Sequence, residues 1–411
     1  MRENCTSGSV RGAPGNRRSY RKSLSFIAAK VIYEKKEHTM KSKRVLILGG
    51  YGSVGRSLTR LLLKETQVEV IIAGRRKEKA DEFAAALSQE FPGNRASSRC
   101  IDASDQASLI EAFQDVQLII VLTTTPNLVK QIAQAALVSG CDYLDILVSE
   151  STYRDLDALS SSIRQQKSIF ITQAGFHPGL PAVFVRYGAQ YFDKYEKAKI
   201  GMAMNARFER AEQAAEIILL VSEFKADIFE AGSWRKATYK DAVNMEMGNR
   251  FGKMQLFPIQ MIEIKRTQEM FNLDETGVYA SGFNWFVDNV VFPLILVTQK
   301  IKKGLATGWL TKLFVWGVNT FSSSCPGVVF LNEAEGMKDG KRTKVRIVAE
   351  HDDAYLFTAI PVVACLKQYF DGAIPVGLWM MGHVVDEKTL CSDMEKMGVR
   401  VETEIVNTTV G

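Results

Sequence analysis

The chain has 411 residues, 46% of them hydrophobic and 24% charged, which is typical of a globular protein long enough for two or three domains. Its net charge of +6 is concentrated in residues 1–43, where eleven Lys or Arg face three Glu, so the remaining chain is close to neutral at −2. Nucleic-acid binding is therefore not indicated, because the excess positive charge lies in a tail rather than on a folded face.

Residues 1–42 form a basic leader that we expect to lie outside the fold. It lacks the long apolar region of a secretory signal. We favour a non-native start upstream of Met40, because the Lys-Lys-Glu codons before it can spell a ribosome-binding purine run. An Arg- and Ser-rich organellar transit peptide is the second interpretation. The six cysteines are far apart and form no CxxC, so we expect no metal site, no disulfide framework and a reducing, cytoplasmic location.

Residues 43–175 alternate between apolar runs and helical periodicity. Buried strands are predicted at RVLILG, VEVIIAG, RCID, QLIIVLTTT, YLDIL and SIFITQA, with a helix between successive strands. One of these helices opens at Thr125-Pro126 and ends at Gly140. Such alternation predicts an α/β fold, a doubly wound parallel sheet of the Rossmann type.

The alternation of strand and helix patterns ends after Gly175. Residues 176–355 are predicted to form an inserted, antiparallel α+β domain for substrate binding and dimerisation. Residues 344–358 are predicted to form a hairpin turning at Asp352-Asp353. Residues 356–411, an apolar helix and a terminal strand, are predicted to return to the first domain.

Residues 283–321 are strongly apolar but interrupted by Asp288, Pro293 and Lys312, so neither run reaches the length of a membrane-spanning helix. A helical pair that forms a dimer interface or covers the substrate cavity is one interpretation. Peripheral membrane contact, assisted by Lys300, Lys302 and Lys303, is the other.

The first strand runs into Gly50-Tyr51-Gly52-Ser53-Val54-Gly55, a GxGxxG turn followed by an amphipathic helix. Gly50 is expected to permit the tight turn, Gly52 to let the backbone approach a pyrophosphate, and Gly55 to allow close packing of helix on strand. The backbone amides of Ser53 and Val54 then lie at a helix N-terminus, where phosphates bind.

The coenzyme is predicted from the end of the second strand. An NAD enzyme places a carboxylate there for the ribose 2′-hydroxyl, whereas this chain has Arg75 and Arg76. A guanidinium binds a 2′-phosphate bidentately, so NADP is predicted, with Arg75 the closer of the two to the strand.

Three further residues follow strands of the same sheet. Asp102 is expected either near the adenine or as a helix N-cap. Thr123 and Thr124 end the fourth strand, where small hydroxylated side chains suit the passage of the nicotinamide half of the coenzyme.

Four blocks of the sequence, GGYGSVGRSLTRLLL, AGRRKEKA, GCDYLDI and QAGFHPGLPAVFVRY, together resemble the saccharopine dehydrogenase-like oxidoreductases. Later blocks, including FNWFVDNVVFPL and GLWMMGHVVD, resemble uncharacterised members of that family. The resemblance implies a Rossmann NADP domain, an inserted α+β domain, a homodimer, and activity on imines formed from an amino acid or polyamine and a carbonyl compound. A more distant group resembles enoyl reductases.

Two residues are candidates for acid–base chemistry. His177 replaces part of the CGxDPG-like turn of the saccharopine-forming enzymes and could donate a proton to a nascent amine, or it could pack against the following helix. Asp145 ends the fifth strand and could face the cleft or bind backbone amides. His383 is expected to be structural and His351 a turn residue.

The sequence thus predicts an NADP-dependent oxidoreductase that transfers hydride to or from an imine- or carbonyl-type small substrate. An imine substrate would require a carboxylate-binding cation, for which Arg207, Lys265 and Arg266 are candidates. An enoyl reductase on a hydrophobic acyl substrate, and a non-catalytic NADP-binding scaffold or redox sensor, remain the alternatives.

Overall fold

The computed structural model describes residues 43–123, 126–205, 226–302, 305, 307–322 and 327–408. The predicted leader, Thr124, Thr125 and Arg207 lie outside these ranges, so their predicted roles stay predictions.

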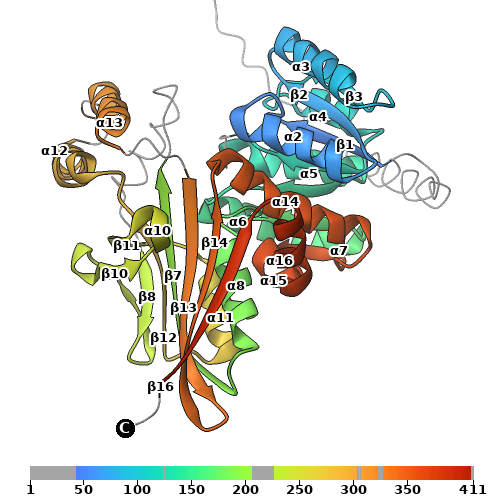
Figure 1. Ribbon diagram of the computed structural model, residues 1–411. Helices are drawn as coiled ribbons and strands as arrows, with labels where there is room; N and C mark the ends of the chain where they lie inside the picture. Colours follow the sequence, from blue (N-terminus) through green and yellow to red (C-terminus); the bar gives the residue numbers. More distant parts are fainter. Residues whose placement is uncertain are drawn as a thin grey trace, which may run out of the picture.

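The first sheet has seven parallel strands in the order β15-β6-β5-β4-β1-β2-β3 (Figure 1). This confirms the predicted Rossmann-type parallel sheet. The order reverses direction between β1 and β4, and in such sheets ligands bind in the crevice at the carboxyl ends of the strands at this point. The strands are β1 (Arg44–Leu48), β2 (Glu69–Gly74), β3 (Ala96–Cys100), β4 (Leu118–Val121), β5 (Asp142–Asp145), β6 (Ile169–Thr172) and β15 (Gly377–Met380).

Helices connect these strands and cover both faces of the sheet (Figure 1). The helix predicted after Thr125-Pro126 ends as expected at Gly140, which has a left-handed φ of 67°. The connecting helices are α2 (Ser53–Glu65), α3 (Lys77–Glu90), α4 (Gln106–Phe113), η1 (Pro126–Leu128), α5 (Val129–Ser139), α6 (Glu150–Asp157) and α7 (Ser160–Gln165).

The second sheet has nine strands, and α8 (Leu180–Ala189) and α11 (Glu263–Phe271) lie on one face of it (Figure 1). Seven strands follow the order β10-β11-β12-β7-β13-β14-β16, while β8 pairs with β12 and β9. β12 and β7 are parallel and the other pairs are antiparallel. The strands are β7 (Lys194–Asn205), β8 (Asp227–Glu230), β9 (Ser233–Lys236), β10 (Val243–Glu246), β11 (Lys253–Ile259), β12 (Glu275–Ser281), β13 (Gly327–Lys338), β14 (Lys341–His351) and β16 (Arg400–Thr408), with short helices η2 (Tyr239–Asp241) and α10 (Gly248–Phe251) between them.

The hairpin predicted at Asp352-Asp353 is wrong. β14 ends at His351, and Asp353 caps the N-terminus of α14 (Ala354–Phe370) by accepting hydrogen bonds from the amides of Tyr355 and Leu356. The turn of the hairpin lies thirteen residues earlier, between β13 and β14, at Asp339 and Gly340, both of which have positive φ.

The C-terminal segment contributes to both sheets. α14 packs against α2 of the first sheet, and β15 extends that sheet beside β6. α15 (Met381–Val384) and α16 (Glu387–Lys396) follow, and then β16 pairs with β14 in the second sheet. The predicted terminal strand therefore exists, but it lies in the second sheet rather than against the first domain.

One hydrophobic core runs through both halves of the molecule. It includes Ile47 and Leu58 of the first sheet and its helix α2, Phe357 of α14, and Phe184 and Phe330 of α8 and β13. Because these side chains pack in one continuous cluster, burial of apolar surface holds the two sheets together.

A helical pair projects from the second sheet at upper left in Figure 1. The apolar helical pair, residues 283–321, comprises the π-helical turn η3 (Val287–Val291), α12 (Phe292–Ile301) and α13 (Thr307–Phe321). It has a small core of its own. Within the described residues, no helix is both long and apolar enough to span a bilayer.

Candidate functional site

The glycine-rich turn between β1 and α2 presents backbone at the carboxyl edge of the first sheet. A Cβ on Gly55 would collide with the carbonyl of Gly49, so the predicted close packing at Gly55 is present. The tight turn, however, depends on Gly49, whose φ is +86°, and not on Gly50. Both Gly49 and Gly50 precede the helix, and the GxGxxG spacing begins at Gly50, so the prediction assigned the turn to Gly50.

No side chain of the turn covers the N-terminus of α2. Gly52 is the N-cap and makes no side-chain capping bond, and the first turn of the helix contains no acidic residue. A Cβ at Gly52 would lie 3.2 Å from the carbonyl oxygen of Gly49, so any larger residue would crowd the turn. The first amides of a helix, here those of Ser53 and Val54, have no partner within the helix. This arrangement fits a pyrophosphate.

Cationic side chains follow β2 beside this turn. Arg75 and Arg76 are both exposed, and neither forms an ion pair with another described residue. The guanidinium of Arg76 lies 5.6 Å from the centre of the Tyr51 ring, and its amide donates to the Tyr51 hydroxyl. Gly74 has no side chain, and a Cβ there would collide with Tyr51. Arg75 is therefore the freer of the two cations for a 2′-phosphate.

Asp102 lies beside the same arginine, but it does not cap a helix. Its Oδ1 accepts hydrogen bonds from the amide and the hydroxyl of Ser104. These bonds, with a smaller contribution from the charge of Arg75, lower the pKa of Asp102. The N-cap of α4 is Asp105, which accepts from the amide of Ala107. The N-cap interpretation of Asp102 is thus wrong.

Thr123 lies on the other side of the glycine-rich turn. A Cβ added to Gly49 would be 3.2 Å from its Cγ2, so Thr123 packs directly against the turn at the carboxyl end of β4. This is where the nicotinamide half of a dinucleotide passes in a Rossmann-type sheet. Thr124 lies outside the described residues.

Asp145 is fully buried at the end of β5. Its carboxylate accepts from the hydroxyl of Thr172 and from the amides of Leu147 and Gln173, and so joins the ends of β5 and β6. Burial raises the pKa of Asp145 to about 6. The geometry supports the second of the two interpretations, a carboxylate that binds backbone amides rather than one that faces a substrate.

His177 lies in the segment between β6 and α8, with its ring centre 5.7 Å from that of Phe176. Burial lowers the pKa of His177 to about 4. At pH 7 in this state the ring is therefore a neutral hydrogen-bonding group. As a proton donor to an amine it would need a changed environment when substrate binds.

A buried carboxyl joins the second sheet's helix α11 to this segment. Glu263 is fully buried, and its Oε1 accepts from the amide of Gly179 at the start of α8 over 3.0 Å. Its Oε2 has no hydrogen-bond partner among the described residues, and burial raises the pKa of Glu263 to about 8. The sequence prediction missed Glu263. Its position on the buried face of α11, with Ile264 and Thr267, was the available signal.

Arg266, one turn further along α11, is exposed and forms no ion pair with the described residues. Its charge acts on Tyr153 of α6 and helps to lower the pKa of His383 of α15 to about 4, although burial is the main cause of that shift. α6 and α15 follow β5 and β15, so the charge of Arg266 is within electrostatic range of elements at the carboxyl edge of the first sheet. Lys265 is engaged elsewhere, in an ion pair with Asp227 over 3.0 Å.

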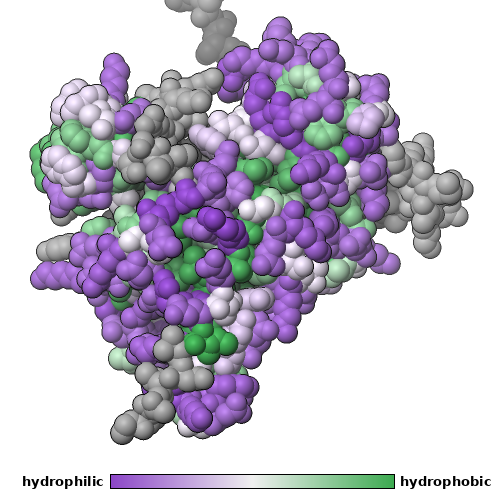
Figure 2. All heavy atoms as spheres, viewed as in Figure 1, coloured by the Kyte–Doolittle hydropathy of each residue, from purple (hydrophilic) through white to green (hydrophobic). Residues whose placement is uncertain are grey.

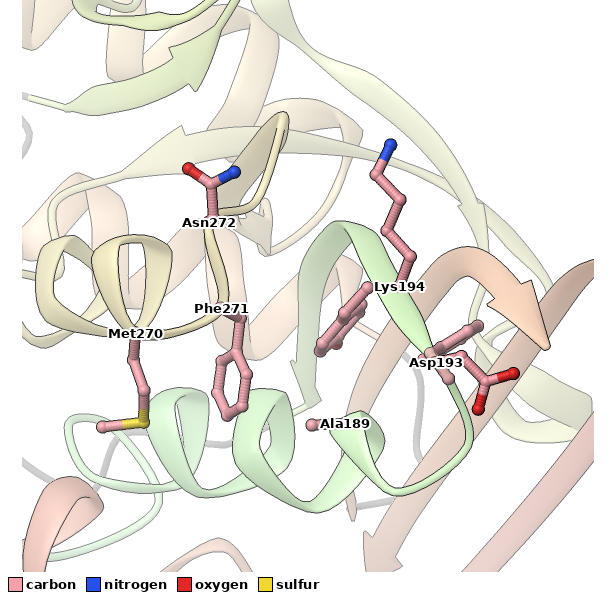
Figure 3. Close-up of a pocket in the computed structure, with 8 residues that line it drawn as sticks. Ala189, Asp193, Lys194, Met270, Phe271 and Asn272 are labelled. Carbon is pink, nitrogen blue, oxygen red and sulfur yellow. The ribbon is translucent and has the colours of Figure 1, made fainter.

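A groove of about 410 Å³ lies at the far end of the same two helices. In Figure 3, Met270 and Phe271 at the end of α11 point toward α8, near Ala189. The starts of α8 and α11, at Leu180 and Glu263, are about 14 Å away at 1.5 Å per residue. This groove is therefore separate from the edge where the coenzyme motif lies.

Residues 45–175 match the family model for the saccharopine dehydrogenase NADP binding domain. This match covers the first domain, so the first domain is of the saccharopine dehydrogenase NADP-binding type. It is similar to carboxynorspermidine synthase of Vibrio cholerae serotype O1, with 22% identity over 367 residues, 79% of this chain and 88% of the relative. Its fold is similar to that of saccharopine dehydrogenase (L-Glu forming) from Saccharomyces cerevisiae, with a TM-score of 0.66, 13% identity, and coverage of 89% of this chain and 100% of the other.

The domain match and these similarities confirm two predictions. The protein is an NAD(P)-dependent oxidoreductase, and its first domain binds NADP. The turn at Gly49–Gly55 and the cations after β2 fit such a coenzyme, because they offer backbone amides to a pyrophosphate and free guanidinium groups to a 2′-phosphate.

Proposed function

We propose that this saccharopine dehydrogenase-like protein transfers hydride between NADP and the imine or carbonyl carbon of a small substrate that carries a carboxylate. The reaction would take place where α11 of the second sheet faces the carboxyl edge of the first. The observation that carries the proposal is Arg266, a cation without an ion pair among the described residues, placed opposite α6 and α15.

The roles of the chain's residues follow from their positions. Arg75 and Arg76 would hold the 2′-phosphate, and the amides at the start of α2 would hold the pyrophosphate. The bound nicotinamide supplies or accepts the hydride. Arg266 would bind the substrate carboxylate bidentately and so fix the distance between the reacting carbon and the coenzyme. Positioning of this kind accounts for a large part of catalysis without a strong acid–base pair.

His177 remains the candidate for hydrogen bonding to the substrate nitrogen or oxygen, as a neutral ring. Asp145 would act through the backbone, because it holds together the ends of β5 and β6 at the carboxyl edge of the first sheet. We assign neither a proton-transfer step.

The names of two relatives support a substrate or product that is an amine with a carboxylate. Carboxynorspermidine is by name a carboxylated polyamine, and saccharopine dehydrogenase (L-Glu forming) is named for an amino-acid product. Both relatives are covered over most of their length by this chain, so the similarity extends beyond the coenzyme-binding domain.

The test is NADPH oxidation measured against pairs of amines with keto acids or aldehyde acids, and separately against enoyl thioesters. Turnover of an amine–carbonyl pair that disappears when the carboxylate is replaced by an amide supports the proposal. Turnover of enoyl thioesters alone would favour the enoyl reductase alternative. Tight NADPH binding without turnover of either panel would favour the sensor.

Arg266→Ala tests the carboxylate contact directly. Loss of a charge-assisted hydrogen bond of about 1.5–3 kcal/mol is expected to raise KM by about 10- to 100-fold for carboxylate substrates. NADPH affinity should be unchanged, and Arg266→Lys should restore part of the loss. Arg164→Ala, an exposed arginine on α7, is the control. Equal kinetics for the two alanine variants would contradict the assignment.

A further inference from the structure

The outer surface of the apolar helical pair is unusually hydrophobic for an exposed surface. Among its exposed side chains are Trp285, Val297, Ile301, Trp309 and Trp316, whose exposed fractions range from 52% to 72%. Three of the chain's five tryptophans therefore lie on one small projection. Green and pale atoms predominate there, at upper left in Figure 2. Contiguous apolar surface of this kind marks an interaction site.

These side chains are not needed to hold the pair together. Its core consists of other residues, including Val291, Ile295, Phe314 and Val318, all fully buried. The pair thus folds around its inner residues and presents a second apolar layer outward.

The same segment carries an excess of positive charge. Lys302 and Lys312 are exposed, and the sequence of residues 283–321 contains four lysines and a single acidic residue, Asp288. The Asp288 carboxylate accepts a hydrogen bond from the amide of Phe283 over 2.9 Å, and its burial raises the pKa of Asp288 to about 6. The acid is thus engaged with backbone at the start of the pair, while Lys302 and Lys312 are exposed.

We propose that the apolar helical pair is a membrane-docking element that lies in the interface of a bilayer containing anionic lipid. Tryptophan is favoured at the boundary between headgroups and acyl chains, since its ring is apolar and its N–H is polar. Lysines with long apolar stems reach from that depth to anionic headgroups. The element inserts without spanning, which agrees with the length of its helices.

The same chemistry disfavours a second copy of this chain as the occupant. Lysine is depleted in the buried cores of protein interfaces, and a symmetric contact through this surface would bring two sets of lysines together. Anionic lipid, in contrast, complements both the charge and the aromatic layer.

The experiment is flotation of the full chain with vesicles of phosphatidylglycerol and phosphatidylcholine in equal parts, and with vesicles of phosphatidylcholine alone. The wild type should float with the anionic vesicles, less so at high salt. Each lysine near an anionic surface contributes about fivefold to partitioning, so Lys302→Glu with Lys312→Glu should lower binding to anionic vesicles by about 25-fold or more.

A second variant tests the apolar layer. Trp309→Ser with Ile301→Ser removes two exposed side chains that lie outside the core of the pair, and should lower partitioning by about tenfold or more. Val376→Ser and Lys341→Glu, at exposed positions outside the pair, are the matched controls and should float like the wild type. Circular dichroism and thermal melting check that each variant folds.

Brominated lipids give a readout on the unmodified protein, because they quench tryptophans that reach the acyl chains. Quenching of wild-type fluorescence together with loss of flotation in both variants supports the proposal. A wild type that does not float, or variants that float equally well, would overturn it. So would a light-scattering dimer that both variants convert to monomer, since the occupant would then be a second copy.

Discussion

Arg75 is the residue whose change gives the clearest prediction for the coenzyme. It is exposed and without an ion pair among the described residues, whereas Arg76 already lies over the ring of Tyr51. Removing a charge-assisted contact to the 2′-phosphate costs about 1.5–3 kcal/mol, so Arg75→Ala should weaken NADPH binding by about 10- to 100-fold.

The internal control for Arg75→Ala is NADH, which has no 2′-phosphate and should bind wild type and variant alike. Isothermal titration of both coenzymes measures the preference, and Arg76→Ala should reduce it less. A preference for NADPH that survives in Arg75→Ala would show that the 2′-phosphate is bound elsewhere.

At this scale the sequence predicted what depends on local pattern. Gly55 and Arg75 could be found because strand, turn and helix follow one another within about thirty residues, and the spacing is set by the nucleotide. Glu263 could not be found, because its role depends on Gly179, which is 84 residues away in sequence and meets it only in the folded chain. The same limit applies to Asp145, whose two interpretations differ only in which way the carboxylate faces.

At the scale of elements, α14 depends on an N-cap that the sequence analysis assigned to a hairpin turn. Asp353 accepts from the amides of Tyr355 and Leu356 over 2.7 and 2.9 Å. Acidic residues favour both turns and N-caps, so the type of residue alone did not distinguish them. The seventeen-residue apolar helix that follows is the stronger indication of an N-cap, since such a helix requires an N-terminal residue that binds its first amides.

Asp353→Ala should therefore destabilise the start of α14 by about 1 kcal/mol. The measurement is hydrogen exchange of the first turn of α14, which should become faster, together with a small fall in thermal melting temperature. Asp353→Asn retains an acceptor oxygen and should behave nearly as the wild type. If Asn and Ala variants exchange equally fast, the side-chain acceptor is not what stabilises this helix.

The second sheet was harder to predict than the first, and its strand pairing shows why. β7 and β13 pair over almost their full length, with Met204 opposite Val328, more than a hundred residues apart. No local pattern carries such a pairing, whereas parallel strands in the first sheet are mostly separated by one helix. β15 likewise joins the first sheet only through its position beside β6.

At the scale of the whole molecule, Glu263 of α11 binds the amide of Gly179 at the start of α8, just after the chain has left β6 of the first sheet. The pKa of Glu263 in the folded state, about 8, is above the usual glutamate value of 4.5, so folding favours the protonated form. Between these two values the unfolded state has lost its proton and the folded state keeps it. Stability therefore falls as pH rises through this range, by about 1.4 kcal/mol per pH unit for one such group.

Other buried groups leave a window in which Glu263 can be observed. The pKa of Asp145 is raised from 3.8 to about 6, so this group also lowers stability as pH rises, but its contribution stops changing at about pH 6. The pKa values of His177 and His383 are lowered from 6.5 to about 4, so these two groups raise the free energy of unfolding as pH rises. Their contribution stops changing at about pH 6.5. From pH 6.5 to 8, Glu263 is thus the one of these four groups that makes the free energy of unfolding depend on pH.

Glu263→Gln keeps the shape of the protonated carboxyl and an acceptor for the amide of Gly179, and cannot ionise. The wild type should lose about 2 kcal/mol of unfolding free energy between pH 6.5 and 8, and the variant should lose little. Denaturant unfolding at several pH values in this window measures the difference. Glu150→Gln, at an exposed position on α6, should retain the wild-type slope. A Glu263→Gln variant that keeps the full slope would mean that another group titrates on unfolding, and that Glu263 is ionised in the folded protein.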